Sequence, residues 1–471
     1  MMERPGKYIR ISVPGIRMAA YVYLALPVVL FFFGWLRLPL AVVFTLLLLI
    51  GLFCTYRILW VSNHGEIGHD AMSDGANHSV GIPLAAVMIS IALVLMWIYG
   101  SGIGGYVWQR TDWHARNAVM HDLLDNKWPV VFPDGSGLVY YLVFWMVPAT
   151  VGKMVGTFLG TAAAWNVANV LLYIWCAIGL FILVLLLFSF VAGRYGTAHS
   201  FKTTDNAKSK DDVGTRYLSI GQCVLILAFI LFWGGINLIG QIAASLGGKA
   251  QFILFDTYGW SHYQYTPDFA CIEWVFNQAI PAWIGTLLFV HARRSRTASE
   301  YMTIVLLVMP LSPLAAVGLM LLTLTDICAY RGKGLFYTSG ICMALATLPV
   351  FGSYYGINGA MSGVEGMSGI GLYIPLSEFG LYDVAVLMVF WTAEFLIYAF
   401  LIWKKYKRDY LFVHDIVLLL ILPFFRIGWG RDFIMRGSMC PFFLLMIYVL
   451  FAVLDKDYRK AGDKKGVFGL K

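Results

Sequence analysis

The chain has 471 residues, of which 60% are hydrophobic and only 13% are charged, with a net charge of +8. Soluble domains carry about 25% charged residues, and apolar runs long enough to cross a ~30 Å hydrocarbon core recur from end to end. The composition excludes a soluble enzyme, a disulfide scaffold and a disordered regulator. Because the runs do not alternate polar and apolar residues, we predict an all-α, polytopic helical membrane protein, not a barrel.

The apolar runs predict about 10–13 membrane segments in a single transmembrane domain, 1–471. The first run is too long for a signal peptide and has no small-residue cleavage site, so it is expected to be an uncleaved span. The predicted spans are 18–36, 38–60, 84–99, 138–159, 162–191, 217–246, 275–291, 300–309, 314–328, 335–351, 380–403, 411–424 and 439–455.

Basic residues concentrate in alternate loops, and such loops stay in the cytoplasm. Loops that carry 25 of the 34 Lys and Arg residues are 1–17, 57–83, 192–216, 292–299, 329–334, 404–409 and 455–471. We therefore expect a multi-pass protein of the cytoplasmic (inner) membrane with both termini in the cytoplasm. The charge bias is a topology signal and does not indicate nucleic acid.

Two segments depart from a simple up-and-down count. Segment 138–159 holds Pro148, Lys153 and several glycines, which predicts a short, broken or re-entrant helix. Segment 300–328 has basic loops at both ends and Pro310-Leu-Ser-Pro313 at its centre. Proline ends a helix, so a tight hairpin of short helices is expected there.

The first predicted outer loop, 100–137, contains a helical pattern from Asp112 to Asp125. One side of this pattern is apolar, which predicts an interfacial amphipathic helix with that side toward the membrane. Asp112 stands at its start, four residues before Arg116. The pattern leaves two interpretations of Asp112: a simple N-cap paired with Arg116, and a cap that is also catalytic.

The further outer loops are 247–274, 352–379 and 425–438. Loop 425–438 carries three arginines against the single carboxylate Asp432, an excess that suits an anion because guanidinium groups match phosphate oxygens. A surface network around Asp432, or lipid head-group contact, is the alternative. Loop 247–274 mixes aromatic rings, Tyr263 and Tyr265 among them, with polar groups. That composition suits sugar stacking or an interfacial aromatic belt.

Two ionisable residues lie inside apolar runs. Glu394 falls near the middle of 380–403, where a charge costs about 3 kcal/mol unless paired, so a function or a buried partner is expected. Lys153 is placed to reach a phosphate or an interface. The seven cysteines form no CxxC pair and the histidine-containing segment 64–78 matches no metal motif, so we expect no disulfide framework, no cofactor and no defined metal site.

The early acidic loop resembles that of GT-C class membrane glycosyltransferases. The matching stretch is Thr111-Asp-Trp-His-Ala-Arg-Asn117, followed by Lys127-Trp-Pro-Val130 and by the segment from Leu138 that contains Lys153. As a whole the sequence is similar to polytopic proteins of bacterial cell-surface polysaccharide loci. The matching motif covers about 50 residues, and the rest of the chain is similar in layout only.

The resemblance implies transfer of a sugar from a polyprenyl-phosphate donor to a glycan or lipid-linked acceptor on the outer face, usually with inversion. Asp112 would be the general base. Phosphate-binding candidates are Arg110, Arg431, Arg436 and Lys153; sugar- or acceptor-binding candidates are His114, Arg116, Tyr263, Tyr265 and Asp432. Membrane lipids are the other expected partners, and a divalent metal requirement stays open.

Two alternatives use similar substrates. An O-antigen-type polymerase or ligase also acts on polyprenyl-linked sugars, but it typically places its chemistry in a large late outer loop. A lipid-linked oligosaccharide flippase or other transporter would explain Glu394, Lys153 and the broken helices, yet it should gather polar residues at the membrane midplane. Here they gather at one face.

Overall fold

The computed structural model describes residues 8–64, 79–197, 215–237, 242, 245–246, 261–329, 336–361, 369–375, 377–428 and 430–455. Nearly all of this is helix. In chain order the helices are α1 (Val13–Trp35), α2 (Leu38–His64), α3 (Leu84–Gly100), α4 (Trp113–Asp125), α5 (Met146–Leu159), α6 (Thr161–Tyr195), α7 (Ile220–Phe232), α9 (Asp268–Trp274), α10 (Phe276–Arg294), α11 (Tyr301–Val308), α12 (Pro313–Ala329), α13 (Thr338–Met361), α14 (Leu381–Trp391), α15 (Ile397–Tyr406), α16 (Tyr410–Ile421), α17 (Asp432–Gly437) and α18 (Met439–Leu454).

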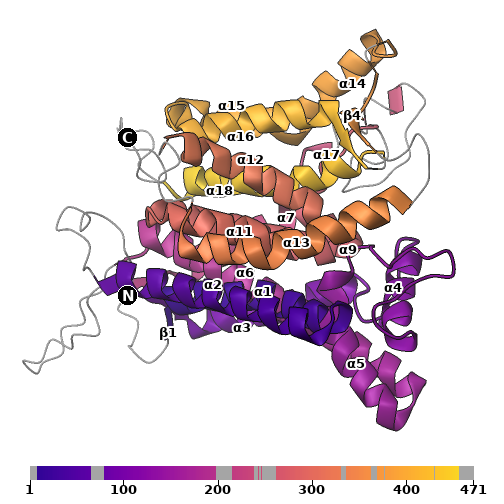
Figure 1. Cartoon of the computed structure of the whole chain (residues 1–471). Coiled ribbons are helices and arrows are strands. Elements are labelled where there is room, and N and C mark those ends of the chain that lie inside the picture. The colour runs from indigo at the N-terminus through magenta and orange to yellow at the C-terminus, as the bar shows by residue number, and fades with distance from the viewer. Residues whose placement is uncertain are drawn as a thin grey trace, which may run out of the picture.

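Most long helices lie side by side with their axes in roughly one direction, in stacked layers (Figure 1). Helices α1, α2, α3 and α6 form one side of the stack, α10, α11 and α13 the middle, and α12, α15, α16 and α18 the other side. The central α10 contacts α6, α11, α12 and α18. Its side chains are buried along its whole length, so α10 is the core of the bundle.

Small sheets mark the two ends of the bundle. At one end, which we call the β1 end, β1 (Tyr8–Ser12) pairs antiparallel with β2 (Ser79–Pro83), and β2 pairs parallel with β3 (Thr215–Tyr217). At the opposite α4 end, β4 (Ile370–Leu372) pairs antiparallel with β5 (Phe425–Ile427). The β1 end thus joins three loops predicted to be cytoplasmic, and the α4 end joins two loops predicted to be external.

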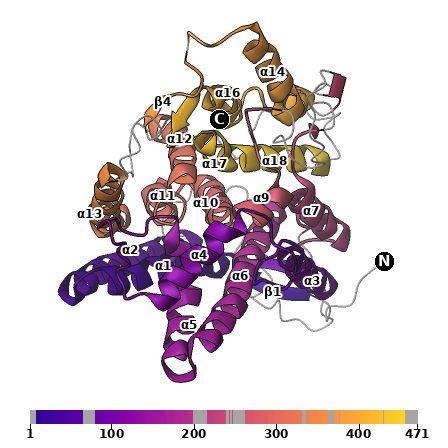
Figure 2. The ribbon, with the colours of Figure 1, turned by 90° about the vertical axis from the view of Figure 1, so that its right-hand side faces the viewer.

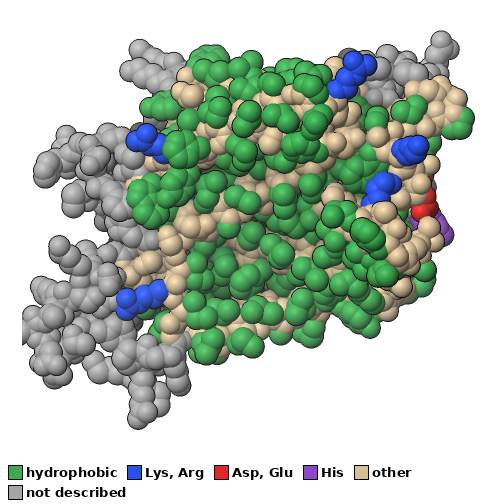
Figure 3. Space-filling model, turned by 60° about the horizontal axis from the view of Figure 1, so that its bottom comes forward, with side chains coloured by type: hydrophobic (Ala, Val, Ile, Leu, Met, Phe, Trp, Pro, Cys, Tyr) green, Lys and Arg blue, Asp and Glu red, His purple; other side chains and the backbone are tan. Residues whose placement is uncertain are grey.

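The exposed surface between the two ends is apolar. On the face in Figure 3, hydrophobic side chains cover the middle, and charged side chains lie near the ends. Six described helical segments are long and apolar enough to cross a bilayer: Val13–Trp35, Leu38–Trp60, Leu142–Leu159, Thr161–Tyr195, Leu381–Tyr406 and Asp432–Leu454. Shorter apolar helices, including α3, α7 and α12, lie among them. The chain is a polytopic helical membrane protein, as predicted.

Helices α5 and α6 form a tight hairpin that projects from the α4 end (Figure 2). A Cβ atom at Gly152 would lie 2.8 Å from the Cβ of Ala168, and one at Gly156 would lie 2.8 Å from the Cβ of Ala164. Only glycine allows this approach, because small residues let two helix backbones pack closely. Gly160, at φ +85°, makes the turn. The predicted short helix in 138–159 is confirmed as a 3₁₀ turn (Leu142–Trp145) followed by α5.

The predicted hairpin around Pro310–Pro313 is also present. The amide of Ser312 donates to the Val308 carbonyl oxygen at 2.8 Å, which ends α11, and α12 begins at Pro313. The predicted span 217–246, in contrast, is interrupted. Helix α7 ends at Phe232, and the chain after it hydrogen-bonds to the α14–α15 segment, where the amide of Ile236 donates to the Ala393 carbonyl oxygen at 2.7 Å.

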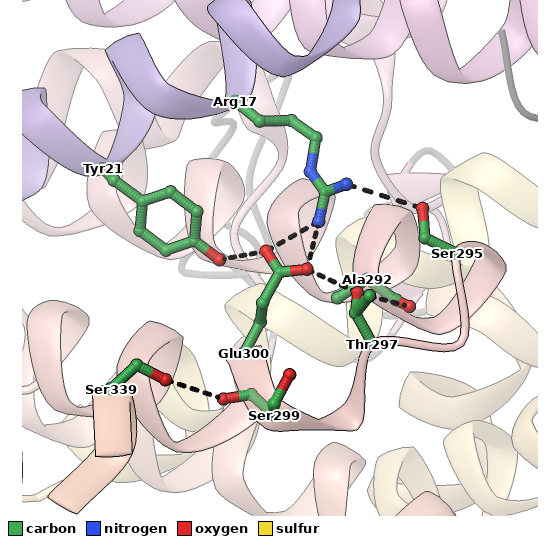
Figure 4. Close-up of polar contacts among 8 residues, drawn as sticks. All are labelled: Arg17, Tyr21, Ala292, Ser295, Thr297, Ser299, Glu300 and Ser339. Carbon is green, nitrogen blue, oxygen red and sulfur yellow. Dashed lines mark hydrogen bonds and ion pairs between the residues drawn. The ribbon is translucent and has the colours of Figure 1, made fainter. Parts of the chain in front are cut away.

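A buried ion pair fastens α1 to the loop between α10 and α11 (Figure 4). Arg17 donates to both carboxylate oxygens of Glu300 at 2.6 Å, and the Tyr21 hydroxyl donates to the same carboxylate at 2.7 Å. Arg17 and Glu300 are almost fully shielded from solvent. Because each charge depends on the other, losing one partner of such a pair costs about 3–5 kcal/mol.

Candidate functional site

Helix α4 forms as the sequence predicts, and Asp112 is its N-cap residue. The Asp112 side chain makes no capping hydrogen bond. Instead Oδ2 of Asp112 lies 3.6 Å from Nη2 of Arg116; the carboxylate side chain is 58% exposed and the guanidinium side chain only 4%. The structure therefore confirms that Asp112 is the N-cap residue and that it pairs with Arg116. It does not show a capping hydrogen bond from the Asp112 carboxylate.

The apolar side of α4 packs on protein, which corrects the expected orientation toward lipid. Trp113, Val119, Met120 and Leu123 are buried, and the helix contacts α5 and α6. The Trp113 ring stacks on Phe276 at the start of α10, with ring centroids 5.4 Å apart. This packing holds Asp112 and Arg116 against the core of the bundle.

Arg436 reaches the same region from the far end of the chain. It lies in the short helix α17, where Nη1 pairs with Oδ1 of Asp432; the Arg436 side chain is 7% exposed and that of Asp432 is 37% exposed. The guanidinium carbon of Arg436 lies 5.3 Å from the ring centroid of Tyr141. Tyr141 adopts a left-handed backbone conformation with φ 49°, which is uncommon for a residue with a side chain.

The charges of these two groups of residues interact. Burial lowers the pKa of Arg116; Tyr140 and Asp112 raise it, and the positive charge of Arg436 lowers it further. Burial raises the pKa of Tyr141, Arg436 opposes this rise, and Asp432 adds to it. The buried guanidinium groups of Arg116 and Arg436 thus interact electrostatically, and each pairs with a more exposed carboxylate. We call Asp112, Arg116, Tyr141, Asp432 and Arg436 the Arg116–Arg436 site.

The geometry of this site favours an anion. Among the described residues, Nη1 of Arg116 and Nε of Arg436 have no hydrogen-bond partner, although both are buried. Unpaired buried donors are costly, and like charges held close together repel each other. A phosphate between the guanidinium groups would satisfy both the donors and the charges.

Comparison of the chain with protein-family models, curated protein sequences and solved structures gives no match.

Arg431 makes a different set of contacts from Arg436. Its Nη1 donates to the Ser261 carbonyl oxygen at 3.2 Å. It lies near His262, whose Nε2 is 3.7 Å from Oδ1 of Asp383. Burial lowers the pKa of His262, Asp383 raises it, and Arg431 lowers it. The sequence predicted that the arginines of this loop act together. In the structure, Arg431 contacts Ser261, whereas Arg436 pairs with Asp432.

Two further phosphate candidates are engaged elsewhere. Arg110 pairs with Glu273 at 2.6 Å and lies over the Trp274 ring. Lys153 donates to the carbonyl oxygens of Leu123 and Leu124, at 3.2 and 3.0 Å, and to that of Asn126.

The three carbonyl groups that Lys153 contacts lie at the end of α4. A cation at a helix C-terminus satisfies its last carbonyl groups. Lys153 therefore fixes α4 on α5, and its three donors already have acceptors.

The aromatic sugar-binding candidates lie in the interior. Tyr265 is fully buried, and its hydroxyl donates to the Leu419 carbonyl oxygen at 2.5 Å. Tyr263 is buried beside a small apolar cavity of about 70 Å³. His114 is exposed on α4. Residues 247–260 and 362–368 of the predicted outer loops, and the histidines of 65–78, lie outside the described residues.

Sequence reasoning missed the contribution of Tyr140 and Tyr141 to the site. Arg116, predicted as a sugar-binding candidate, pairs with Asp112, and its charge interacts with that of Arg436. The spacing of four residues between Asp112 and Arg116 on a helix does predict that their side chains lie on the same face. No sequence pattern predicts the left-handed backbone conformation of Tyr141.

Proposed function

We propose that the chain is a GT-C-like glycosyltransferase that takes a sugar from a polyprenyl-phosphate donor on the outer face of a cell membrane. The observation that carries the proposal is a pair of buried guanidinium groups whose charges interact, Arg116 and Arg436, the first of which pairs with the exposed carboxylate of Asp112. The helices of the bundle would hold the lipid tail of the donor, and α4 would act as the juxtamembrane helix. No cofactor is required by this scheme.

The reaction uses each of these groups. The Asp112 carboxylate accepts the proton of the acceptor hydroxyl, and the acceptor oxygen attacks the anomeric carbon of the donor sugar. The bond between that carbon and the phosphate oxygen breaks, and its electron pair leaves with the polyprenyl phosphate. Arg116 and Arg436 stabilise the negative charge that develops on the phosphate. A single displacement of this kind inverts the anomeric configuration.

The proposed orientation places the α4 end outside and the β1 end in the cytoplasm. In its support, β1 and β3 belong to the basic loops 1–17 and 192–216, and β2, which pairs with both strands, belongs to loop 57–83. Basic loops remain on the cytoplasmic side. The acceptor would then be a glycan or a lipid-linked glycan that reaches the outer surface.

The test compares two carboxylates of the same helix. Membranes are supplied with a polyprenyl phosphate that carries radiolabelled glucose, galactose or mannose. Asp112→Asn should reduce transfer of the labelled sugar about 10²–10⁴-fold, the usual contribution of a general base. Asp125→Asn is the matched control, because Asp125 is similarly exposed and pairs only with His121 in the described part of the chain. Transfer by Asp112→Asn at the wild-type rate would remove Asp112 as the base.

A polymerase or ligase would use the same site chemistry with a different donor, one that carries a whole glycan. The mass of the labelled product separates these two cases from transfer of a single sugar: a polymerase or ligase moves a whole glycan, and the proposed enzyme moves one residue.

One observation favours a transporter as the second candidate. Glu394 is fully buried in a π-helical turn (Thr392–Leu396) between α14 and α15, and its carboxylate packs on Gly235, just after α7 ends. Interrupted helices with a buried ionisable group are typical of transport sites. A transporter would move a fluorescent polyprenyl-linked sugar between leaflets, and Glu394→Gln would stop that movement without affecting sugar transfer.

A further inference from the structure

A second cavity lies at the α4 end, between the loop after α3, helix α4 and the first turns of α6. Its volume is about 350 Å³. Sites for small ligands occupy about 300–1,000 Å³, so this cavity has the size for one small ligand or one unit of a larger ligand. Its walls are formed by Gly104, Gly105, Tyr106, Gln109, Asn117, Trp165, Asn166, Asn169 and Val170.

The lining is polar but uncharged. Four of its side chains are amides, two are aromatic, and none is Lys, Arg, Asp, Glu or His. An amide offers both donors and acceptors, which suits hydroxyl groups that also donate and accept. An anionic or cationic ligand would find no opposite charge on these walls and would lose its hydration without compensation.

Hydrogen bonds fix three of the four amides in place. The Asn117 Nδ2 donates to Oε1 of Gln109 at 2.9 Å, and Nε2 of Gln109 donates to the Gly102 carbonyl oxygen at 2.8 Å. The Asn169 Nδ2 donates to the Trp165 carbonyl oxygen at 3.0 Å. These bonds use one donor group of each of the three amides and leave further donor and acceptor capacity at the cavity.

The two aromatic rings are also held in position. The Trp165 ring stacks on His121, with centroids 4.0 Å apart and planes 9° apart. The Tyr106 ring makes an edge contact with Tyr173 at 5.8 Å. Rigid aromatic rings beside hydroxyl-binding amides provide an apolar face together with polar contacts. A sugar ring presents the same two features.

We infer that this cavity binds one neutral sugar residue, held by the amides of Asn117, Asn166 and Asn169 and by the rings of Tyr106 and Trp165. The inference rests on the proposed function only in assigning that residue to the acceptor glycan. Asn117 follows Asp112 by five residues, which places it about 140° around α4 from the carboxylate. The cavity therefore binds a sugar beyond the reacting one and gives the enzyme a preference for its acceptor.

The experiment measures binding of free sugars to the full-length protein in nanodiscs of phosphatidylethanolamine and phosphatidylglycerol. Purification avoids maltoside and glucoside detergents, because their head groups would compete. Glucose and N-acetylglucosamine are the neutral probes, glucuronic acid and glucose 6-phosphate the charged ones, and saturation-transfer NMR reports contact. The neutral sugars should bind at millimolar concentration, and the charged sugars about tenfold more weakly or not at all.

Three variants show where binding takes place. Val170→Trp fills the cavity and leaves every amide in place, and Asn166→Ala removes an amide from an exposed helix position. Each should weaken binding of the neutral sugars at least about tenfold. Trp108→Ala is the matched control: Trp108 is 77% exposed in the same loop but does not line the cavity, so binding should be unchanged.

The failures of the two proposals are distinguishable. If wild-type protein transfers sugar from a polyprenyl-phosphate donor but binds none of the free neutral sugars, or binds them equally well in Val170→Trp, the inference about the cavity is wrong and the proposed function stands. If neutral sugars bind and Val170→Trp abolishes their binding while no sugar transfer occurs, the cavity is a sugar site in a protein that is not this transferase.

Discussion

Replacement of Arg436 by lysine tests whether α17 supplies the phosphate-binding cation. Lysine keeps the charge but loses the planar fork of the guanidinium group, and so loses one of two charge-assisted hydrogen bonds to a phosphate. Such a bond contributes about 1.5–3 kcal/mol. Because about 1.4 kcal/mol corresponds to a tenfold change, the Kd for a polyprenyl phosphate should rise about 10- to 150-fold.

The assay uses the group that all proposed donors share. Farnesyl phosphate is titrated into protein in nanodiscs, and intrinsic tryptophan fluorescence reports binding, so the identity of the sugar is not needed. Farnesol, which lacks the phosphate, corrects for binding of the chain alone. The buried position of Arg436 beside Tyr141 also predicts that its effect persists at high salt, since buried charges are poorly screened.

Arg431→Lys is the matched control for this measurement. Arg431 lies five residues earlier in the same loop, but it donates to the Ser261 carbonyl oxygen and lies near His262. Its replacement should change the Kd less than about threefold, which is under 1 kcal/mol. Equal losses in the two variants, or a larger loss in Arg431→Lys, would refute the assignment of the phosphate to Arg436.

Three further predictions concern stability. Gly152→Val should force α5 away from α6 and destabilise the protein by about 1–3 kcal/mol, the usual cost of overpacking; an unchanged melting temperature in detergent would contradict the close packing. Arg17→Met should destabilise the protein by about 3–5 kcal/mol because Glu300 loses its buried partner, and adding Glu300→Leu should recover part of the loss; a double variant less stable than the single one would argue against this. Burial lowers the pKa of His262, so the folded state favours the neutral ring. The unfolded imidazole titrates near pH 6.5, so this contribution to stability is present above that pH and is lost as the pH falls. The melting temperature should therefore fall from pH 7.5 to 5.5 by less in His262→Gln than in the wild type, and equal falls would contradict the pKa shift.

Composition and local pattern were sufficient for much of the fold. The apolar runs predicted the helical membrane class, and the spacing of Trp113, Val119, Met120 and Leu123 predicted α4. The prolines at 310 and 313 predicted the α11–α12 hairpin. These features depend on residues close together in the chain, so a sequence carries them directly.

Features that depend on distant contacts could not be predicted. Helix α7 ends at Phe232, inside a continuous apolar run, where the chain instead bonds to the segment around Glu394. The sequence also could not tell which arginine of 425–438 would join Asp112. Arg431 and Arg436 lie at opposite ends of the short helix α17, and the packing of that helix on α12 decides where each side chain lies.

The most direct measurement of the central claim is a structure of the protein with farnesyl phosphate bound. We predict that the phosphate lies between the guanidinium groups of Arg116 and Arg436, with its lipid tail among the helices and Asp112 facing the solvent side. A phosphate bound at Arg431 and His262, or at the β1 end of the bundle, would contradict it.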